Sequence, residues 1–208
     1  MHSYSLDPKS ARRADEQGGR IDESGKYIGV FTRVEPFTSE KGAQGVGFDF
    51  KSNSGGTASF TLYTHSKAGS PIFGLDWMNA ILTVLRTKQV SVQAAPVEKY
   101  NAETKQREKV TAQCFVELMN KPIGIVLQKE WYTNQKGADA YRFSPYAIFD
   151  AETEQVASEV LDQKPADRLG RIVATLKDRD TRSKTAAPQA SGHAALKGFD
   201  DFEDDIPF

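Results

Sequence analysis

The sequence has little of what catalytic and disulfide-bonded proteins use. Of its 208 residues one is cysteine, Cys114, and three are histidine. A single cysteine excludes an intramolecular disulfide framework and a cysteine-rich zinc site. The alternation around Cys114 predicts a small buried hydrophobe rather than a nucleophile. No Gly-x-x-x-x-Gly-Lys-Ser/Thr motif occurs, which excludes a P-loop. We therefore expect no enzyme activity, no metal and no cofactor.

Long apolar runs are missing as well. No run approaches the roughly 20 residues that a membrane-spanning helix needs. The first residues lack the basic-then-apolar pattern of a secretory signal. Hydrophobic residues make up 38% of the chain and charged residues 26%, which suits one core with unpacked stretches around it. The sequence predicts a soluble cytoplasmic protein without a membrane partner.

The charges are unevenly distributed. The last ten residues contain five acids and no base: Asp200, Asp201, Glu203, Asp204 and Asp205. Without them 23 acids remain against 27 lysines and arginines, so residues 1–198 carry a formal charge of about +4. Such asymmetry predicts an acidic tail with its own role and a body that favours anions.

The first half of the chain alternates with the period of half-buried strands. Residues 27–36, 46–51 and 59–65 are the expected strands, and glycine-rich joints between them predict an antiparallel meander. In the first strand, alternation places Phe31 and Arg33 together on one face with Tyr27. Ser70 and Pro71 then predict the start of a helix. Its apolar stripe is Leu75, Met78, Leu82 and Leu85.

The second half predicts more strands and then helices. Residues 89–100 and 109–119 are expected to be strands joined by a charged tip, and 123–132 and 141–149 are expected to be extended. Residues 150–164 favour helix. A clearer helix begins at Pro165, with the apolar stripe Leu169, Ile172, Val173 and Leu176.

We therefore predict five parts. They are a flexible N-terminal arm (1–25), a mainly β domain with helices (26–150), a helical extension (151–180), a disordered linker rich in small residues (181–198) and an acidic tail (199–208). Three strands, a helix and further strands follow the order of the OB-fold, a small β-barrel that binds oligonucleotides and oligosaccharides. Fold alone does not fix function.

The chain ends with Asp204, Asp205, Ile206, Pro207 and Phe208. This end resembles the acidic tail of bacterial single-stranded DNA-binding proteins, in which aspartates precede a terminal Ile-Pro-Phe. Phe208 offers an apolar ring and an α-carboxylate to a partner's pocket, and Pro207 limits the entropy lost on docking. The aspartates steer the peptide toward basic patches.

The body carries a second resemblance. Residues 25–35 (GKYIGVFTRVE) and 45–50 (GVGFDF) are similar to phage-encoded single-stranded DNA-binding proteins with an OB-fold. This implies a protein that coats single-stranded DNA without sequence preference during phage DNA replication, recombination or repair, in the host cytoplasm. Its tail would recruit replication or recombination enzymes. The long arm and the helical extension depart from the bacterial proteins, so their tetramer is not implied; a homo-oligomer or a cooperative assembly on DNA stays open.

Single-strand binding needs exposed rings for base stacking and cations for phosphates. Tyr63 is the best candidate, because alternation puts it opposite the buried face of its strand. The other candidates are Phe31, Arg33, Lys99, Tyr100, Lys105, Arg107, Lys109, Phe115, Trp131 and Tyr132. Each aromatic could instead pack under residues 150–180 or in a dimer contact.

Two other functions remain open from the sequence. An interaction adaptor or DNA mimic would use the acidic tail on basic proteins and bind no DNA itself. An OB-fold could also bind RNA or an oligosaccharide.

Overall fold

The computed structural model describes residues 19–101, 104 and 106–182. The predicted tail, nearly all of the linker and most of the N-terminal arm lie outside the described residues. The last part of the arm packs more tightly than expected. Ile21 is buried in the main core, and its N–H donates to the carbonyl of Thr57 at 2.7 Å. The flexible arm therefore does not extend to residue 25.

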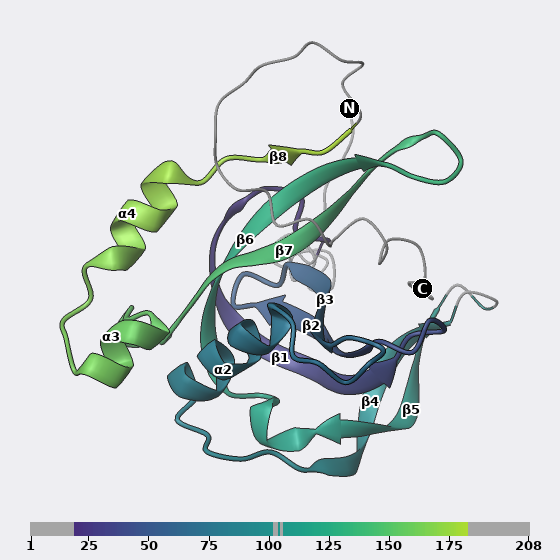
Figure 1. Cartoon of the computed structure of the whole chain (residues 1–208), viewed down its shortest axis with the longest axis horizontal. Coiled ribbons are helices and arrows are strands. Elements are labelled where there is room, and N and C mark those ends of the chain that lie inside the picture. The colour runs from purple at the N-terminus through teal and green to yellow at the C-terminus, as the bar shows by residue number, and fades with distance from the viewer. Residues whose placement is uncertain (1–18, 102–103, 105, 183–208) are drawn as a thin grey trace, which may run out of the picture.

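Five long strands form the body (Figure 1). They are β1 (Gly25–Thr38), β2 (Gln44–Ser52), β3 (Thr57–His65), β6 (Pro122–Thr133) and β7 (Asp139–Phe149), in the order β3-β2-β1-β6-β7. The predicted meander of three strands is confirmed, and the chain is mainly β. β7 also lies near β3. Within the described residues no ladder joins these two edges, so the expected closed barrel is not found.

A bulge in β1 changes which side chains reach the core. Phe31 pairs with Phe50 and Arg33 with Asp49, so Thr32 is an extra residue and the alternation shifts by one. Phe31 is fully buried, whereas Arg33 points to the opposite face. The prediction that the two share an exposed face is wrong. A strand bulge inverts the facing of everything beyond it, and alternation alone does not reveal one.

The core between the strands is aromatic. The ring of Phe31 lies 4.9 Å from that of Phe48 and 6.1 and 6.2 Å from those of Phe50 and Phe60. Helix α2 (Gly74–Val84) covers this core and buries Met78, Ile81 and Val84. It begins later than Ser70, because Pro71 still bridges to His65 of β3. A side chain at Gly74 would collide with the backbone of Tyr63, so the helix starts in close contact with β3.

A separate hairpin follows α2. Strands β4 (Val92–Asn101) and β5 (Gln106–Phe115) form their own two-stranded sheet, which packs beside β1. Its buried side chains are small: Ala95, Val97, Ala112 and Cys114. The strand predicted over 109–119 ends at Phe115, where a 3-10 turn (Val116–Leu118) begins. The burial of Cys114 is confirmed.

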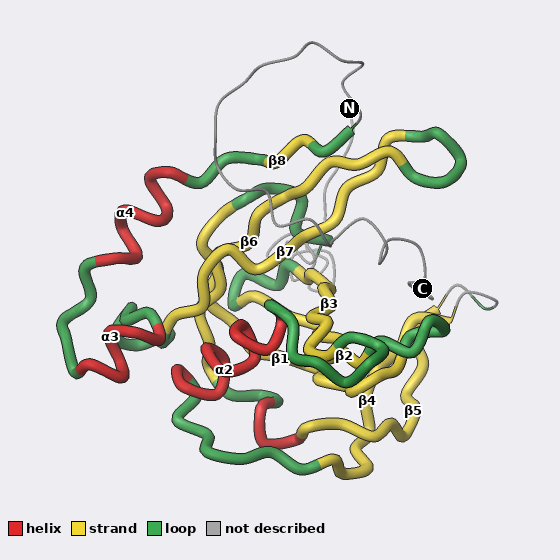
Figure 2. The backbone as a smooth tube through the Cα atoms, in the orientation of Figure 1, coloured by secondary structure: helices red, strands yellow, loops and turns green. Residues whose placement is uncertain are grey.

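The helical extension covers the other face of β6 and β7 (Figure 2). Only Ala157–Asp162 (α3) is helical within the predicted 150–164, and α4 (Arg168–Thr175) begins after Pro165. The predicted stripe is confirmed: Leu169 is buried, and Ile172, Val173 and Leu176 pack with it. A short strand, β8 (Arg179–Asp180), then runs parallel to β6. No helix of the described residues is long and apolar enough to cross a membrane.

Candidate nucleic-acid interface

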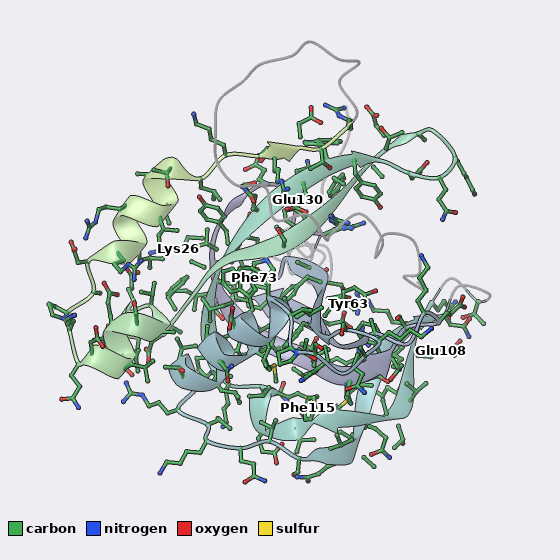
Figure 3. The ribbon with its side chains drawn as sticks, in the orientation of Figure 1. Lys26, Tyr63, Phe73, Glu108, Phe115 and Glu130 are labelled. Atoms are coloured by element: carbon green, nitrogen blue, oxygen red, sulfur yellow. The ribbon has the colours of Figure 1, made fainter. Side chains whose placement is uncertain are left out.

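Two surfaces collect the predicted binding residues. We call the outward side of β1, β2 and β3 the outer face. From here on, 'the arm' means residues 128–144 of β6 and β7, and not the N-terminal residues 1–25. In Figure 1 the end of the arm lies on the same side as the C-terminal end of β4 and the N-terminal end of β5, away from α3 and α4. Figure 3 shows Tyr63 between Glu130 on the arm and Glu108 on the hairpin. Helices therefore leave this side of the molecule uncovered.

On the outer face Arg33 is held by carboxylates. Its Nε and Nη2 donate to the two oxygens of Asp49 at 2.7 and 3.1 Å, and Nη1 donates to Glu35 at 2.8 Å. Ser59 adds a bond to Asp49 at 2.7 Å. A bidentate pair of this kind fixes the guanidinium in place. Arg33 is therefore engaged in ion pairs and does not project as a phosphate ligand.

The ionisation of this group is correspondingly fixed. Burial alone would raise the pKa of Asp49, but hydrogen bonds from Arg33 and Ser59 outweigh it and lower the pKa below its ordinary value. Burial also opposes the charge on Arg33, yet the bonds to Asp49 and Glu35 raise its pKa overall. Each group thus stabilises the charged form of the other.

Beside this network the outer face carries aromatic rings. Alternation placed Tyr63 with Ser59, Thr61 and His65, opposite buried Phe60 and Leu62, and the burial pattern of β3 agrees. The ring of Tyr63 meets that of Phe37 edge to face, with centroids 5.4 Å apart. Sequence reasoning missed Phe37, because the predicted strand ended at Pro36. Continuing the alternation of Arg33 and Glu35 would have found it.

The hairpin brings further cations to the outer face. Lys99 donates to Glu35 at 2.8 Å, which ties β4 to β1. Arg107 is close enough to Asp49 to help lower the pKa of that carboxyl. Lys109 is exposed on β5. The side chain of Tyr100 and residue Lys105 lie outside the described part of the hairpin.

The arm stacks cations on rings instead. Lys129 lies 4.5 Å from the centre of the Trp131 ring and 4.3 Å from that of Tyr141. The two rings are 5.4 Å apart, because Trp131 and Tyr141 are cross-strand partners. Arg182 lies over Trp131 at 5.3 Å and Arg20 over Tyr141 at 5.1 Å. We call these five residues the arm cluster. All its rings are half-buried.

Segments far apart in sequence hold the arm cluster together. Thr181 binds the carbonyl of Trp131 through its N–H at 2.8 Å and its hydroxyl at 2.7 Å. The indole N–H of Trp131 donates to Asp178 at 3.4 Å, and Lys129 donates to the carbonyl of Asp22 at 2.8 Å. Arg182 also pairs with Asp139 and Asp180. The sequence suggested Trp131, but it did not bring in Arg20, Tyr141 or Arg182.

Tyr132 points to the other face of the arm. There Arg142 lies 5.5 Å from its ring and donates to Glu130 at 3.0 Å. Glu130 is buried and also accepts a bond from Arg179 at 3.1 Å, so it joins β6, β7 and β8. Trp131 and Tyr132 were predicted together, but they serve opposite faces because successive strand residues alternate.

Phe115 is a further correction. The prediction put it on an exposed face between Gln113 and Glu117, but β5 ends at this residue. The 3-10 turn that follows redirects the chain, and the ring packs against the main core. Together with buried Phe31, this removes two of the predicted stacking residues from the surface.

One cavity beside the arm does not suit an anion. A shallow cavity of about 460 Å³ lies beside Lys129, between the segment before β1 and the end of α4. Its charged lining is mixed and includes Asp22, Glu23, Asp178, Lys129 and Lys177. Among the described residues, no group of three or more His, Cys, Asp or Glu could hold a metal ion.

Comparison with known proteins assigns no role to these surfaces. No family model matches the chain, and no curated protein matches its sequence.

Proposed function

We propose that this chain is a single-stranded DNA-binding protein without base-sequence preference, and that its acidic end, residues 199–208, recruits partner enzymes. The observation that carries the proposal is the arm cluster. Lys129, Trp131 and Tyr141 combine ring faces with a cation within 4.5 Å. Rings accept any base by stacking, and neighbouring cations bind the backbone, which is the chemistry of sequence-tolerant single-strand binding.

The strand order supports an OB-like arrangement. The path β3-β2-β1-β6-β7, with α2 between β3 and the later strands, follows an OB-fold in which β6 and β7 are the last two strands. The β4–β5 hairpin is then an insertion after α2. OB-folds bind oligonucleotides on the face of their second and third strands and on two flanking loops. Those regions correspond here to the outer face, residues 39–43 and residues 134–138.

The role that follows is to coat and protect exposed single strands in phage DNA replication or recombination. The aspartates before Ile206, Pro207 and Phe208 would bring replication or recombination proteins to the coated strand. With Arg33 and Lys99 paired to carboxylates, the phosphate contacts fall to Lys129 and to the exposed hairpin cations Arg107 and Lys109.

A fluorescence titration tests the proposal. Trp77 and Trp131 are the two tryptophans, so Trp77→Phe leaves the arm cluster as the only indole reporter. We expect an unlabelled oligo-dT to quench this fluorescence saturably, with affinity falling as salt rises. A duplex of equal length should bind much more weakly. Absence of binding, or equal binding of single strand and duplex, would overturn the proposal.

Removing residues 199–208 separates this function from the adaptor or DNA mimic. A DNA-binding body keeps or gains affinity for oligo-dT when its acids are removed, because they repel phosphate. A mimic shows no oligonucleotide affinity before or after the deletion and loses its binding to basic proteins. Competition with oligo-rU and with an uncharged oligosaccharide separates the remaining OB-fold ligands.

A further inference from the structure

The central strand of the outer face carries no side chain at two outward positions. Gly45 lies between Phe37 and Tyr63 in the ladder, and Gly47 lies between Glu35 and Thr61. Both neighbouring strands carry side chains at these rows. Gly45 is buried beneath the Phe37 ring, whereas Gly47 is only partly buried, so the outer face exposes β2 backbone at Gly47.

Packing requires glycine at one of these two positions but not at the other. A Cβ at Gly45 would come within 2.7 Å of the Phe37 ring and 2.8 Å of the carbonyl oxygen of Leu62, so packing requires glycine there. A Cβ at Gly47 would meet nothing closer than the carbonyl of Glu35 at 3.9 Å and Nη1 of Arg33 at 4.0 Å. Gly47 also lies outside the positive-φ region and away from both bulges.

Glycine at position 47 thus lacks a structural reason. Inside a strand, glycine costs about 0.5–1 kcal/mol relative to alanine, and residues with larger side chains pair better across strands. An interior strand glycine without a bulge marks a place where a ligand or another backbone approaches closely. Gly47 is only partly buried, and the atoms nearest its outward position belong to Glu35 and Arg33.

The surroundings of Gly47 indicate what approaches. The Tyr63 and Phe37 rings lie on one side of its row. On the other side lie Arg33, Ser59 and Asp49, whose polar groups hydrogen-bond to one another. The carboxylates of Asp49 and Glu35 disfavour a phosphate here. A planar, uncharged ring suits this position, because it can lie flat on the backbone of Gly47 and contact the neighbouring Tyr63 ring.

We infer that Gly47 is the floor of a nucleobase subsite, in which one unstacked base of a bound single strand lies against the backbone of β2 beside Tyr63. This subsite rests on the proposed function and adds to it. It places one base on the outer face, in addition to the bases stacked on the arm rings, and leaves the phosphates to the hairpin and arm cations. It also explains why Arg33 is neutralised by two carboxylates, since the subsite receives an uncharged base.

Graded substitution of Gly47 tests the subsite. A Cβ at Gly47 meets nothing closer than 3.9 Å, so we expect Gly47→Ala and the larger Gly47→Val both to fold, which urea unfolding checks. Gly170→Ala on α4, where nothing lies within 4 Å of the new Cβ, is the matched control. We expect Gly47→Val to weaken binding of oligo-dT by about 5- to 150-fold, the value of one base stack, and Gly47→Ala to weaken it less. Gly170→Ala should bind as the unsubstituted protein does.

An abasic oligonucleotide of the same length gives the second readout. It keeps the phosphates but lacks bases, so Gly47→Val should leave its affinity unchanged. The salt dependence for oligo-dT should also stay unchanged, because no ionic contact is lost. If the unsubstituted protein binds oligo-dT and Gly47→Val binds it equally well, the subsite is wrong and the proposed function stands. If the unsubstituted protein binds no oligo-dT, the proposed function itself fails. An equal loss for both oligonucleotides overturns the subsite as well.

Discussion

The cations of the outer face and Lys129 of the arm are held in opposite ways. On the outer face Arg33 and Lys99 donate to Asp49 and Glu35, so each positive charge has a carboxylate partner. On the arm Lys129 lies on the rings of Trp131 and Tyr141 and donates to a main-chain carbonyl. The outer-face cations are thus neutralised by carboxylates, whereas Lys129 is held by two rings and a carbonyl oxygen.

This difference shows why a count of bases does not locate a phosphate site. Arg33 and Lys129 each lie two residues from an aromatic residue on an alternating strand, Phe31 and Trp131, yet only Arg33 was predicted from the sequence as a binding residue. The ladder puts Asp49 opposite Arg33 but Phe143 opposite Lys129. The cross-strand partner, which depends on register, decides which cation is available. We therefore expect the outer face to bind bases, and the arm to bind both the bases and the phosphates of a single strand.

The largest effect should come from Phe31, which the sequence assigned to DNA and the structure assigns to the core. Phe31→Ala removes a fully buried ring that contacts three other phenylalanines. We expect a loss of about 3–5 kcal/mol in the free energy of unfolding, measured by urea denaturation. Phe73→Ala is the control, since Phe73 is 58% exposed and should cost less than about 0.5 kcal/mol. Equal losses would contradict the burial of Phe31.

The outer-face network should matter next, and for stability rather than for phosphate binding. Arg33→Met leaves Asp49 and Glu35 partly buried with fewer cations, which should cost about 2–3 kcal/mol in urea unfolding. Arg142→Met on the arm is the matched substitution. Glu130 retains Arg179 there, so we expect a cost of only about 1 kcal/mol. A lower salt slope of oligo-dT binding in Arg33→Met would instead make Arg33 a phosphate ligand.

The arm should show the reverse pattern, with changes in binding and little change in stability. Trp131→Ala should weaken oligo-dT binding by about 1–3 kcal/mol without altering the salt slope. Lys129→Met should lower the salt slope by about one. Labelled oligonucleotides and fluorescence anisotropy measure both.

Two surface substitutions are the controls for the arm. Tyr146→Ala alters an exposed ring at the β7 bulge, and Lys88→Met alters an exposed lysine after α2. Neither belongs to the arm cluster, so both should bind as the unsubstituted protein does. A loss of affinity in the controls equal to that in Trp131→Ala would show that the arm cluster has no special role.

The same two regions show how far sequence reasoning reaches. Period-two alternation predicted every long strand and put Tyr63 on the correct face, because β3 has no bulge within the stretch 57–63. It failed at Phe31, where one extra residue in β1 inverts the pattern. It also failed at Phe115, where a 3-10 turn ends the strand.

The arm cluster was only partly predictable, for a different reason. Trp131 and Lys129 are two residues apart, and alternation puts them on one face. Arg20 and Arg182 approach from segments more than 100 and about 50 residues away, through a bridge to β3 and through β8. Contacts of that separation depend on the tertiary fold, and no local pattern in the sequence encodes them.

The smallest expected effect is a pH dependence confined to the outer face. Hydrogen bonds from Arg33 and Ser59 outweigh burial and lower the pKa of Asp49 in the folded state. The group therefore stabilises the fold at pH values above its unfolded pKa, about 3.9, and this contribution is lost as the pH falls through the lower folded value. Urea unfolding between pH 7 and pH 3 should show Asp49→Asn losing about 1 kcal/mol less than the unsubstituted protein over this interval. Asp76→Asn, on an exposed position of α2, should follow the unsubstituted protein. Lys129 contacts rings and a carbonyl oxygen and no carboxylate of this network. Lys129→Met should therefore leave the loss of unfolding free energy between pH 7 and pH 3 unchanged. If Lys129→Met reduced this loss of unfolding free energy as much as Asp49→Asn does, the two regions would not differ in how they neutralise charge.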